Sequence, residues 1–395
     1  MKLPGMLRLI CAQVCLHATM AGCRLAAPLL ALQQGYSAAA VGLLVALFAL
    51  SQVFLALPAG RFADRHGLRR PIGLSVTASV LGAGLVVVFP NFAMMGLAAL
   101  LSGAATGTTV IALQRHVGRA ATDSTELRQA FSWLAIAPAA ANFVGPFVAG
   151  LLIDHAGHTA GDMRAYRVAF LVLALMPLAS WLLVRREREL PPVVAPAGGP
   201  PLRAWDLLRD AMFRRLLFCN WMQSSAWDVH AFLLPVLGHE RGLSASVIGS
   251  ILGAFAIAAA LIRVVLPRLT RNHSERNVIT LATCGTAAVF AAYPFLNSPW
   301  TMGLCSVLLG FTLGSVQPMV MSLLHQITPH HRHGEALGLR LMAINASSVV
   351  IPMVAGSVGA FIGIAGVFWV ISGVLGLGVR VVRRLDAAPV PGQSR

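Results

Sequence analysis

Twelve apolar runs, each long enough to cross a bilayer, limit the fold of this chain more than any other feature of its sequence. A helix needs about 20 mainly apolar residues to span the hydrocarbon core, and helices satisfy all their backbone hydrogen bonds there. We therefore predict an all-α membrane protein with twelve transmembrane helices. The predicted spans are residues 8–32, 38–59, 72–90, 92–113, 129–153, 166–184, 216–237, 244–266, 277–296, 299–324, 335–359 and 361–380.

The composition is that of a polytopic membrane protein. Hydrophobic residues make up 57% of the 395 residues and charged residues only 11%, whereas a soluble protein carries about 25% charged residues. The net charge of +16 would suit a nucleic-acid partner, but the basic residues lie in small packets between the apolar runs and not on one face. We therefore expect a lipid bilayer, and no nucleic acid, as the partner of this chain.

The cysteines and histidines do not have the spacing of a metal site. All six cysteines lie inside apolar runs, without a C-x-x-C pair, which is typical of small buried hydrophobic residues. The sequence "HHRH" at 330–333 has no sensible ligand set nearby and is expected to be a solvated loop. We expect neither a metal nor another cofactor.

The distribution of Lys and Arg predicts the orientation, because cytoplasmic loops are enriched in both. With both termini in the cytoplasm, the outer segments hold only Arg164, Arg167 and Arg241. The first apolar run continues past Cys23 to Leu32, so we interpret it as a transmembrane helix and not as a cleaved secretory signal. The expected location is the inner (cytoplasmic) membrane of a bacterium.

The chain aligns with itself at an offset of 207 residues, which indicates two structural repeats. Phe48 matches Phe255, and Gly103 matches Gly310. Because six spans separate equivalent elements, the repeats have the same orientation and are related by an axis along the membrane normal. Two pseudo-symmetric six-helix bundles of this kind form a transporter architecture, whose interface can open to one side and then the other.

The repeat divides the chain into four predicted parts. These are an N-terminal six-helix bundle (1–184), a cytoplasmic linker (185–215), a C-terminal six-helix bundle (216–384) and a cytoplasmic tail (385–395). Proline and glycine are frequent at the start of the linker. Its second part, with Trp205 and Leu208 at helical spacing, is either a short helix on the inner membrane surface or the lead-in to the seventh span.

The densest charge lies in the turn between the second and third spans, "GRFADRHGLRR", from Gly60 to Arg70. Gly60 and Gly67 permit close approach or a positive φ, and the arginines hold the turn on the inner side. Asp64 contributes little to topology. We expect it to face the N-terminus of a helix from the other half, where the helix dipole favours an anion, so that it latches the inner side shut.

This turn resembles the G-x-x-x-D-R-x-G-x-R-R pattern of the major facilitator superfamily. The matching residues are Gly60, Asp64, Arg65, Gly67, Arg69 and Arg70. The resemblance covers essentially the whole chain, including a degenerate second copy at Arg268 and Arg276 in which Arg271 stands at the place of Asp64. It implies that the turn packs near the cytoplasmic end of the eleventh span, where Glu335 and Arg340 are the expected gate partners. Alternatively, the turn is only a positive-inside signal.

The fifth span resembles a second signature, the glycine-rich stretch ending in G-P-x-x-G-G of drug/proton antiporters in this superfamily. The match consists of Gly145, Pro146 and Gly150, while Ala149 replaces a glycine. Small residues allow spans five and eight to pack closely, and Pro146 supplies a bend. This partial match favours export over import. The arginine that many proton-coupled members carry in the fourth span is replaced by Ala99.

Polar residues inside the spans are the candidates for a substrate site, because they are costly in a membrane. Arg24 and Asp228 lie at similar depth in the first and seventh spans; they either pair across a central cavity or each reach the outer interface. His17 is the second proton-coupling candidate after Asp228, or else a packing residue. Arg263 is expected to extend toward the cytoplasm. The candidate cavity residues are His17, Arg24, Asn220, Ser224, Trp227, Asp228, Gln317 and Asn345.

These features predict a secondary active transporter that works by alternating access, and not an enzyme. The sequence has no visible nucleotide-binding motif, which argues against ATP as the energy source. The leading hypothesis is proton-coupled efflux of a small amphipathic organic compound by a monomer. The alternatives are proton-coupled uptake of an organic anion, suggested by Arg24, and a membrane sensor that does not transport.

Overall fold

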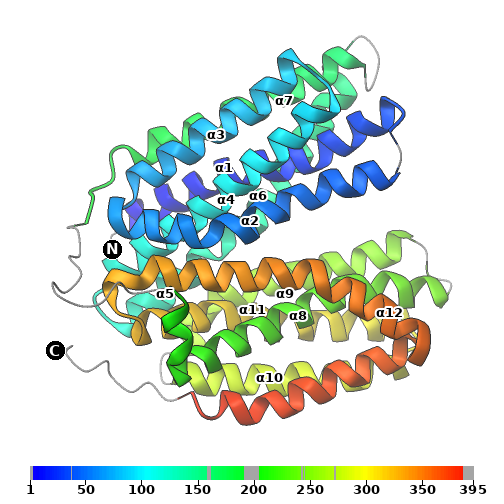
Figure 1. The fold of residues 1–395 in the computed structure, drawn as a ribbon. Helices are drawn as coiled ribbons and strands as arrows, with labels where there is room; N and C mark the ends of the chain where they lie inside the picture. Colours follow the sequence, from blue (N-terminus) through cyan, green and yellow to red (C-terminus); the bar gives the residue numbers. More distant parts are fainter. Residues whose placement is uncertain are drawn as a thin grey trace. The chain divides into compact units, whose positions relative to one another are not determined.

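The computed structural model is helical throughout the residues we describe, with no strand among 3–36, 38–157, 162–190, 204–241, 243, 245–270 and 273–385. Its first half contains α1 (Leu3–Gln33), α2 (Ala38–His66), α3 (Arg69–Val88), α4 (Phe92–Ala120), α5 (Ser124–Leu134), α6 (Ile136–His155) and α7 (Met163–Val184). Its second half contains η1 (Ala204–Arg209), α8 (Ala211–Glu240), α9 (Ala245–Leu269), α10 (Glu275–Ala292), η2 (Tyr293–Phe295), α11 (Pro299–Ile327), η3 (His330–Arg332) and α12 (His333–Val382). Figure 1 labels the α-helices of both halves. The predicted all-α fold class is confirmed.

Eleven segments of the described chain are long and apolar enough to cross a membrane. One of them, Ser124–His155, combines α5 and α6. The expected seventh span is α8, whose 30 residues are long enough for a crossing but whose polar side chains exclude it from this apolar set. Two of the segments, His330–Ile351 and Phe361–Val382, lie in η3 and α12. Helix α12 is interrupted at Gly363, which adopts a positive φ of 75°, and the chain turns back between its orange and red parts (Figure 1).

Side-chain caps mark where several helices begin. Asp123 accepts hydrogen bonds from the backbone N–H groups of Thr125 (2.7 Å) and Glu126 (2.8 Å) at the start of α5. Ser274 caps α10 in the same way. The first N–H groups of a helix have no partner inside the helix, so a side-chain oxygen at this position stabilises the start of the helix.

The predicted linker and tail are described only in part. The first part of the linker follows α7 as far as Leu190, and residues 191–203 lie outside the described chain, as do Arg271 and the tail after Leu385. The linker then forms η1, in which Trp205 is exposed and Leu207 is buried. Asp210 lies between η1 and α8, and its carboxylate accepts a hydrogen bond from the Phe213 N–H (2.7 Å) at the start of α8.

Contacts divide the chain into two compact units. Unit 1 consists of Met1–Ala121, Ile136–Gly198 and His330–Asn345, and unit 2 of Thr122–Ala135, Gly199–Pro329 and Ala346–Arg395. The units follow the two halves of the sequence except in two short segments, since the beginning of α12 belongs to unit 1 and α5 belongs to unit 2. The ends of the two predicted six-helix bundles, at residues 184 and 216, were derived from the sequence repeat. They stay a prediction.

The core of unit 1 is built around α1, which packs against α6 and α7, while α4 packs against α2 and α3. Leu30, Phe48 and Phe170 are among its buried side chains. Helix α6 approaches α1 closely at Gly145, where a β-carbon would lie 2.8 Å from the backbone nitrogen of Gly22. Small residues allow such close approach, and the van der Waals packing that results favours helix association in a membrane.

The core of unit 2 is built around α11, which packs against α8, α9 and α10. The ring of Tyr293 stacks on that of Phe368 with centroids 4.9 Å apart, and the Tyr293 hydroxyl forms a 2.8 Å hydrogen bond with the Ser306 hydroxyl. The ring of His230 lies against that of Tyr293 with centroids 5.8 Å apart. These contacts join the second part of α12 to α8 and α11.

Replacing Gly145 by alanine tests the contact between α6 and α1. The added methyl group overlaps the carbonyl oxygen of Ala18, and we expect a loss of about 1–3 kcal/mol in stability, as for other overpacked sites. The matched control is Gly150→Ala on the same helix, where the β-carbon meets only Leu25 at 3.9 Å and alanine gains helix propensity. The measurement is the midpoint of thermal unfolding in detergent. Equal midpoints for the two variants would contradict the close contact between α6 and α1 at Gly145.

Candidate functional site

The charged turn ends α2 and begins α3, with Gly67 at φ 75° between them. Its acid, Asp64, accepts hydrogen bonds from the backbone N–H groups of Gly334 (2.9 Å) and Glu335 (3.1 Å). These are the second and third residues of α12, so their N–H groups have no partner within that helix. The carboxylate therefore lies at the positive end of a helix dipole, where an anion is favoured.

Asp64 also forms an ion pair that we did not predict. The Nε of Arg115, near the end of α4, donates to Oδ1 of Asp64 at 2.7 Å, and both side chains are almost fully buried. A buried carboxylate with an arginine and two backbone donors has its main hydrogen-bonding sites occupied. Arg115 lies close to the predicted cytoplasmic end of the fourth span, as several other arginines lie close to the ends of spans. Nothing in the neighbouring sequence distinguishes it as the partner of Asp64.

The backbones of α2 and α12 touch at this point. A β-carbon at Gly60 would overlap the carbonyl oxygen of Gly334, and one at Gly338 would lie 2.6 Å from the carbonyl oxygen of Ala56. This close approach brings Glu335 within 2.9 Å of the Arg61 Nε. Arg332 donates to the other carboxylate oxygen of Glu335 at 2.8 Å. Glycine is therefore required on both helices for Asp64 to reach the start of α12.

The remaining residues of the turn separate into two groups. The carboxylate of Glu189, just after α7, accepts from the backbone N–H groups of Leu68 (3.0 Å) and Arg69 (2.6 Å), and Arg69 donates its Nε to the Glu187 carbonyl at 3.0 Å. The side chains of Arg65 and Arg70 are exposed. We had assigned the Glu187–Glu189 segment only to a linker, so its contact with the turn was missed. Arg340, our second expected gate partner, is buried in α12.

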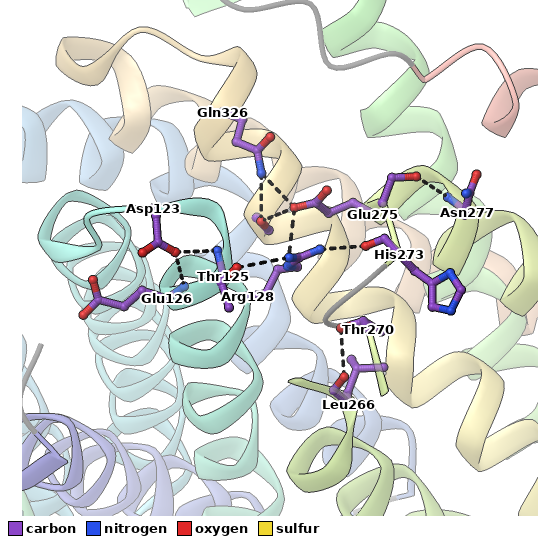
Figure 2. A network of polar contacts seen from close by, with 12 residues as sticks. Asp123, Thr125, Glu126, Arg128, Leu266, Thr270, His273, Glu275, Asn277 and Gln326 are labelled. Carbon is purple, nitrogen blue, oxygen red and sulfur yellow. Dashed lines mark hydrogen bonds and ion pairs between the residues drawn. The ribbon is translucent and has the colours of Figure 1, made fainter. Parts of the chain in front are cut away.

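A second polar cluster lies in unit 2, between α5 and the start of α10 (Figure 2). Arg128 of α5 donates to the carbonyl oxygen of His273 at 2.8 Å, and its Nε lies 3.9 Å from Oε1 of Glu275. The same carboxylate oxygen accepts from Ser322 (2.9 Å) and Gln326 (2.8 Å) of α11. We call this set the Arg128–Glu275 cluster. We did not predict it from the sequence.

The two clusters occupy equivalent positions of the sequence repeat. At the offset of 207 residues, Ser322 corresponds to Arg115 and Arg128 corresponds to Glu335. In both units the turn that follows the second helix of the repeat contacts the start of a helix from the other half of the sequence. The charges are reversed, because the incoming helix carries the acid Glu335 in unit 1 and the base Arg128 in unit 2.

Several candidate cavity residues come together on α8 in unit 2. The Ser224 hydroxyl accepts from Nε2 of Gln317 at 3.5 Å, and the Ser348 hydroxyl donates to Oδ2 of Asp228 at 3.0 Å. Asn220, one turn before Ser224, is buried. Asp228 is half-buried, so this face of α8 presents a carboxyl group and two hydrogen-bonding side chains.

Arg263, which we expected to extend toward the cytoplasm, is packed among other residues of unit 2. It is buried, with its guanidinium carbon 5.9 Å from the centre of the Trp227 ring, and it donates to the carbonyl oxygen of Ala135 at 2.9 Å. The ring of Trp227 lies edge-on to the ring of Phe255, with centroids 4.5 Å apart. An arginine in a span can be stabilised by an aromatic ring and by backbone carbonyls as well as by water, and the extension of Arg263 toward the cytoplasm stays a prediction.

The candidates in unit 1 are less closely grouped. Nδ1 of His17 is buried without a hydrogen-bond partner among the described residues, Arg24 is exposed on α1, and Asn345 donates to the Leu341 carbonyl of its own helix at 2.9 Å. Arg24 and Asp228 fall in different units, so their pairing stays a prediction.

The motif of the fifth span lies on α6. Its Gly145 contacts α1, and Pro146 follows inside the helix. Gly150 faces Leu25 of α1. Arg263 of α9, in the predicted eighth span, donates to the carbonyl oxygen of Ala135, which lies between α5 and α6 within the predicted fifth span. Among the described residues no group of three or more His, Cys, Asp or Glu side chains could hold a metal ion.

Two relatives resemble the chain over most of its length. The multi-drug resistance efflux pump PmrA homolog of Lactococcus lactis is 25% identical over 330 residues, which cover 81% of this chain and 78% of that protein. The class B tetracycline resistance protein of Escherichia coli is 23% identical over 325 residues, which cover 79% of this chain and 77% of that protein.

Solved structures share the fold. The human organic anion transporter TETRAN superposes with a TM-score of 0.77 at 18% identity, covering 97% of this chain and 100% of that one. A bacterial homologue of the iron transporter ferroportin superposes with a TM-score of 0.77 at 15% identity and the same coverage. The family model of the Major Facilitator Superfamily matches residues 9–215 and 216–395. Since these matches cover nearly the whole chain, it belongs to the major facilitator superfamily and is a multi-pass membrane transporter, not an enzyme.

Proposed function

We propose that this transporter exports a small amphipathic organic compound by proton-coupled alternating access in the inner membrane of a bacterium. The observation that carries the proposal is the half-buried carboxyl group of Asp228 on α8, which accepts a hydrogen bond from Ser348. The relatives support export, since one is named as a homolog of a multidrug efflux pump and another as a tetracycline resistance protein.

Proton coupling needs a group that both the proton and the substrate can occupy. A carboxylate is a charged acceptor, and protonation makes it a neutral donor, so a proton and a polar or cationic group of the substrate would compete for Asp228. Ser224 and Gln317, which hydrogen-bond to each other, would orient the polar part of the substrate. His17 is the second candidate for the proton, because its Nδ1 has no partner in the described chain.

An aromatic group beside this polar face supports an amphipathic substrate. Trp227 follows Ser224 on α8 and contacts the ring of Phe255. Aromatic side chains supply a large apolar contact surface at little conformational cost. A compound with a planar apolar ring system and one polar or charged group would meet both requirements of the site.

The two polar clusters would form the gate on the predicted cytoplasmic side. Each connects a turn of one sequence half to a helix start from the other half, through Asp64 with α12 and through Arg128 with the loop before α10. An anion at a helix N-terminus contributes about 0.3–2 kcal/mol. Inverting a two-state equilibrium from 1:99 to 99:1 takes about 5.5 kcal/mol, so contacts of this size can be broken and reformed during transport.

Proton-coupled uptake of an organic anion is the second candidate function. Arg24 is exposed on α1 and would attract a carboxylate or a similar group. A sensor without transport is the third hypothesis, and it predicts that no compound moves.

Transport by purified protein in proteoliposomes distinguishes these three hypotheses. A pH gradient of either sign is imposed across vesicles loaded with hydrophobic cations, tetracycline or organic anions. Antiport predicts that the compound moves against the direction of the proton, and symport predicts that it moves with the proton. A compound that accumulates equally with and without the pH gradient would exclude proton coupling.

Asp228→Asn is expected to abolish accumulation driven by the pH gradient. Asparagine preserves the shape of the side chain but cannot bind and release a proton, so exchange of labelled for unlabelled compound should continue without coupling. The measurement compares gradient-driven transport with exchange at equal pH on both sides. Normal coupling in this variant would assign the proton to another group, and His17→Gln would then be tested.

Asp64→Asn is expected to slow transport by roughly five- to a hundredfold. Typical coupling energies of about 1–3 kcal/mol correspond to changes of this size. The variant weakens the contact with the start of α12 and the pair with Arg115. Substrate binding, followed by the fluorescence of the protein, should remain, because Asp64 is not in the proposed cavity. The matched control is Asp154→Asn, an exposed acid near the end of α6, which should transport like the wild type.

Glu275→Ala is expected to reduce stability by about 1–3 kcal/mol, because Ser322, Gln326 and Arg128 lose a buried acceptor. The control is Asp206→Asn, because its ion-pair partner Arg209 is 86% exposed and the pair should therefore contribute little. The measurement is the midpoint of thermal unfolding in detergent, combined with Arg128→Gln in a double-mutant cycle. A coupling energy of zero between Glu275 and Arg128 would show that Arg128 does not stabilise the cluster.

A further inference from the structure

Arg263 of α9 is a buried arginine whose contacts in the described chain include no acid. Its side chain is 9% exposed and lies on a segment that is long and apolar enough to cross a membrane. The guanidinium contacts one aromatic ring and two backbone carbonyls, and these partners come from three different parts of unit 2. A charge on such a segment is costly and indicates a functional residue, so its partners are the guide to its role.

Two of the partners belong to the helices that carry the proposed substrate site. The guanidinium carbon lies 5.9 Å from the centre of the Trp227 ring, and Trp227 directly precedes Asp228 on α8. Nε of Arg263 donates to the carbonyl oxygen of Gly314 at 3.4 Å. Gly314 lies about one turn before Gln317 on α11. Arg263 is therefore anchored beside both helices that would bind the substrate.

The third partner is the end of α5. Nη1 of Arg263 donates to the carbonyl oxygen of Ala135 at 2.9 Å, and Ala135 is the single residue between α5 and α6. The last carbonyl groups of a helix have no partner inside the helix, and the C-terminal end of the helix dipole favours a cation. Pro138, which follows in the first turn of α6, has no N–H group, so the Leu134 carbonyl also lacks its usual donor. Arg263 therefore caps the C-terminal end of α5.

Helix α5 comes from the first half of the sequence but belongs to unit 2, whereas α6 belongs to unit 1. Near the start of α5, Arg128 donates to the His273 carbonyl (Figure 2). In its middle, the centroid of the Phe131 ring lies 4.9 Å from that of His325 on α11. Arg263 adds a contact at its end. In the alternating access of the proposed function, on which this inference rests, the two halves of the sequence move relative to each other, and α5 would separate from α9 and α11.

We propose that Arg263 is a positioning residue that couples the substrate site to the gate, because it connects the Trp227 ring to the end of α5. While the indole ring lies against the guanidinium, the ring and the carbonyls compensate the buried charge, and α5 stays in place. A planar apolar substrate that takes the place of the guanidinium on Trp227 removes part of this compensation. The separation of α5, which admits water to the guanidinium, then becomes more favourable. Since coupling is reciprocal, the release of α5 also strengthens substrate binding.

Alkylation of a cysteine in α5 measures how often this helix separates from its neighbours. Ser132 is fully buried and lies three residues before Ala135, and Ser132→Cys preserves the size of the side chain. A membrane-permeant maleimide reacts with the introduced cysteine when α5 moves, and mass spectrometry of the peptides gives the rate. Cys219 of α8 is also fully buried and reports unfolding in the same sample. Ala130→Cys, at a second buried position of α5, supplies an independent reporter.

A double-mutant cycle then tests the role of Arg263 without any substrate. Trp227→Leu removes the ring from the guanidinium. We expect it to raise the alkylation rate of the α5 reporter about two- to thirtyfold, the change that corresponds to a typical cation–π contact, while Cys219 stays unreactive. In the Arg263→Gln background, Trp227→Leu should leave the rate unchanged, because the neutral amide has no charge to compensate. Arg263→Lys should restore part of the effect, because lysine keeps the cation.

The matched control is Trp221→Leu on the same helix, a tryptophan whose ring contacts that of Phe218, and it should not change the rate. The proposal is overturned if Trp227→Leu has the same effect with arginine and with glutamine at position 263, if it has no effect with arginine, or if Trp221→Leu acts equally. An equal rise at Cys219 would assign the effect to unfolding and would also overturn it. Transport driven by the pH gradient is measured separately, so failure of this coupling and failure of the proposed function are distinguishable.

Discussion

The close contact between Gly60 of α2 and Gly334 of α12 determines the geometry of the charged turn. Helices in a membrane are not driven together by the hydrophobic effect, because lipid is as apolar as their side chains. Their association depends on close packing and on a few polar contacts. A side chain on either glycine would separate the two backbones. The Asp64 carboxylate could then no longer reach the Gly334 and Glu335 N–H groups, and Glu335 would move away from Arg61.

The two halves of the sequence use different chemistry for the same topological contact. In unit 1 a carboxylate at a helix N-terminus is neutralised by Arg115. In unit 2 Arg128 binds a backbone carbonyl and lies near Glu275, which is held by neutral side chains of α11. The acid of the second cluster is Glu275, at the first position of α10.

Hydroxyl side chains in unit 2 differ in what they bind, and this difference determines which kind of molecule could lie beside them. The hydroxyl of Ser224 is bound by another side chain, that of Gln317, and thereby belongs to a polar face suited to a substrate. The hydroxyls of Thr270 and Ser315 are bound by carbonyls of their own helices, and they leave a surface suited to hydrocarbon. Residue type alone does not separate these two cases, because a hydroxyl in a helix can always bind the carbonyl one turn earlier.

Local sequence was sufficient to predict the helical class, most of the spans and the charged turn, because apolar length and glycine-arginine patterns act over short distances. It also predicted an anion at a helix start for Asp64. The partners were decided only by the tertiary structure. Arg115, Glu189 and Glu275 are ordinary charged residues near helix ends, and their contacts with Asp64, Arg69 and Arg128 join segments 51 to 147 residues apart in the chain. Arg263 could reach water by its length alone, yet it is buried against Trp227. Which helix ends meet depends on how the helices cross, and the crossing is set by packing between residues that no local pattern connects.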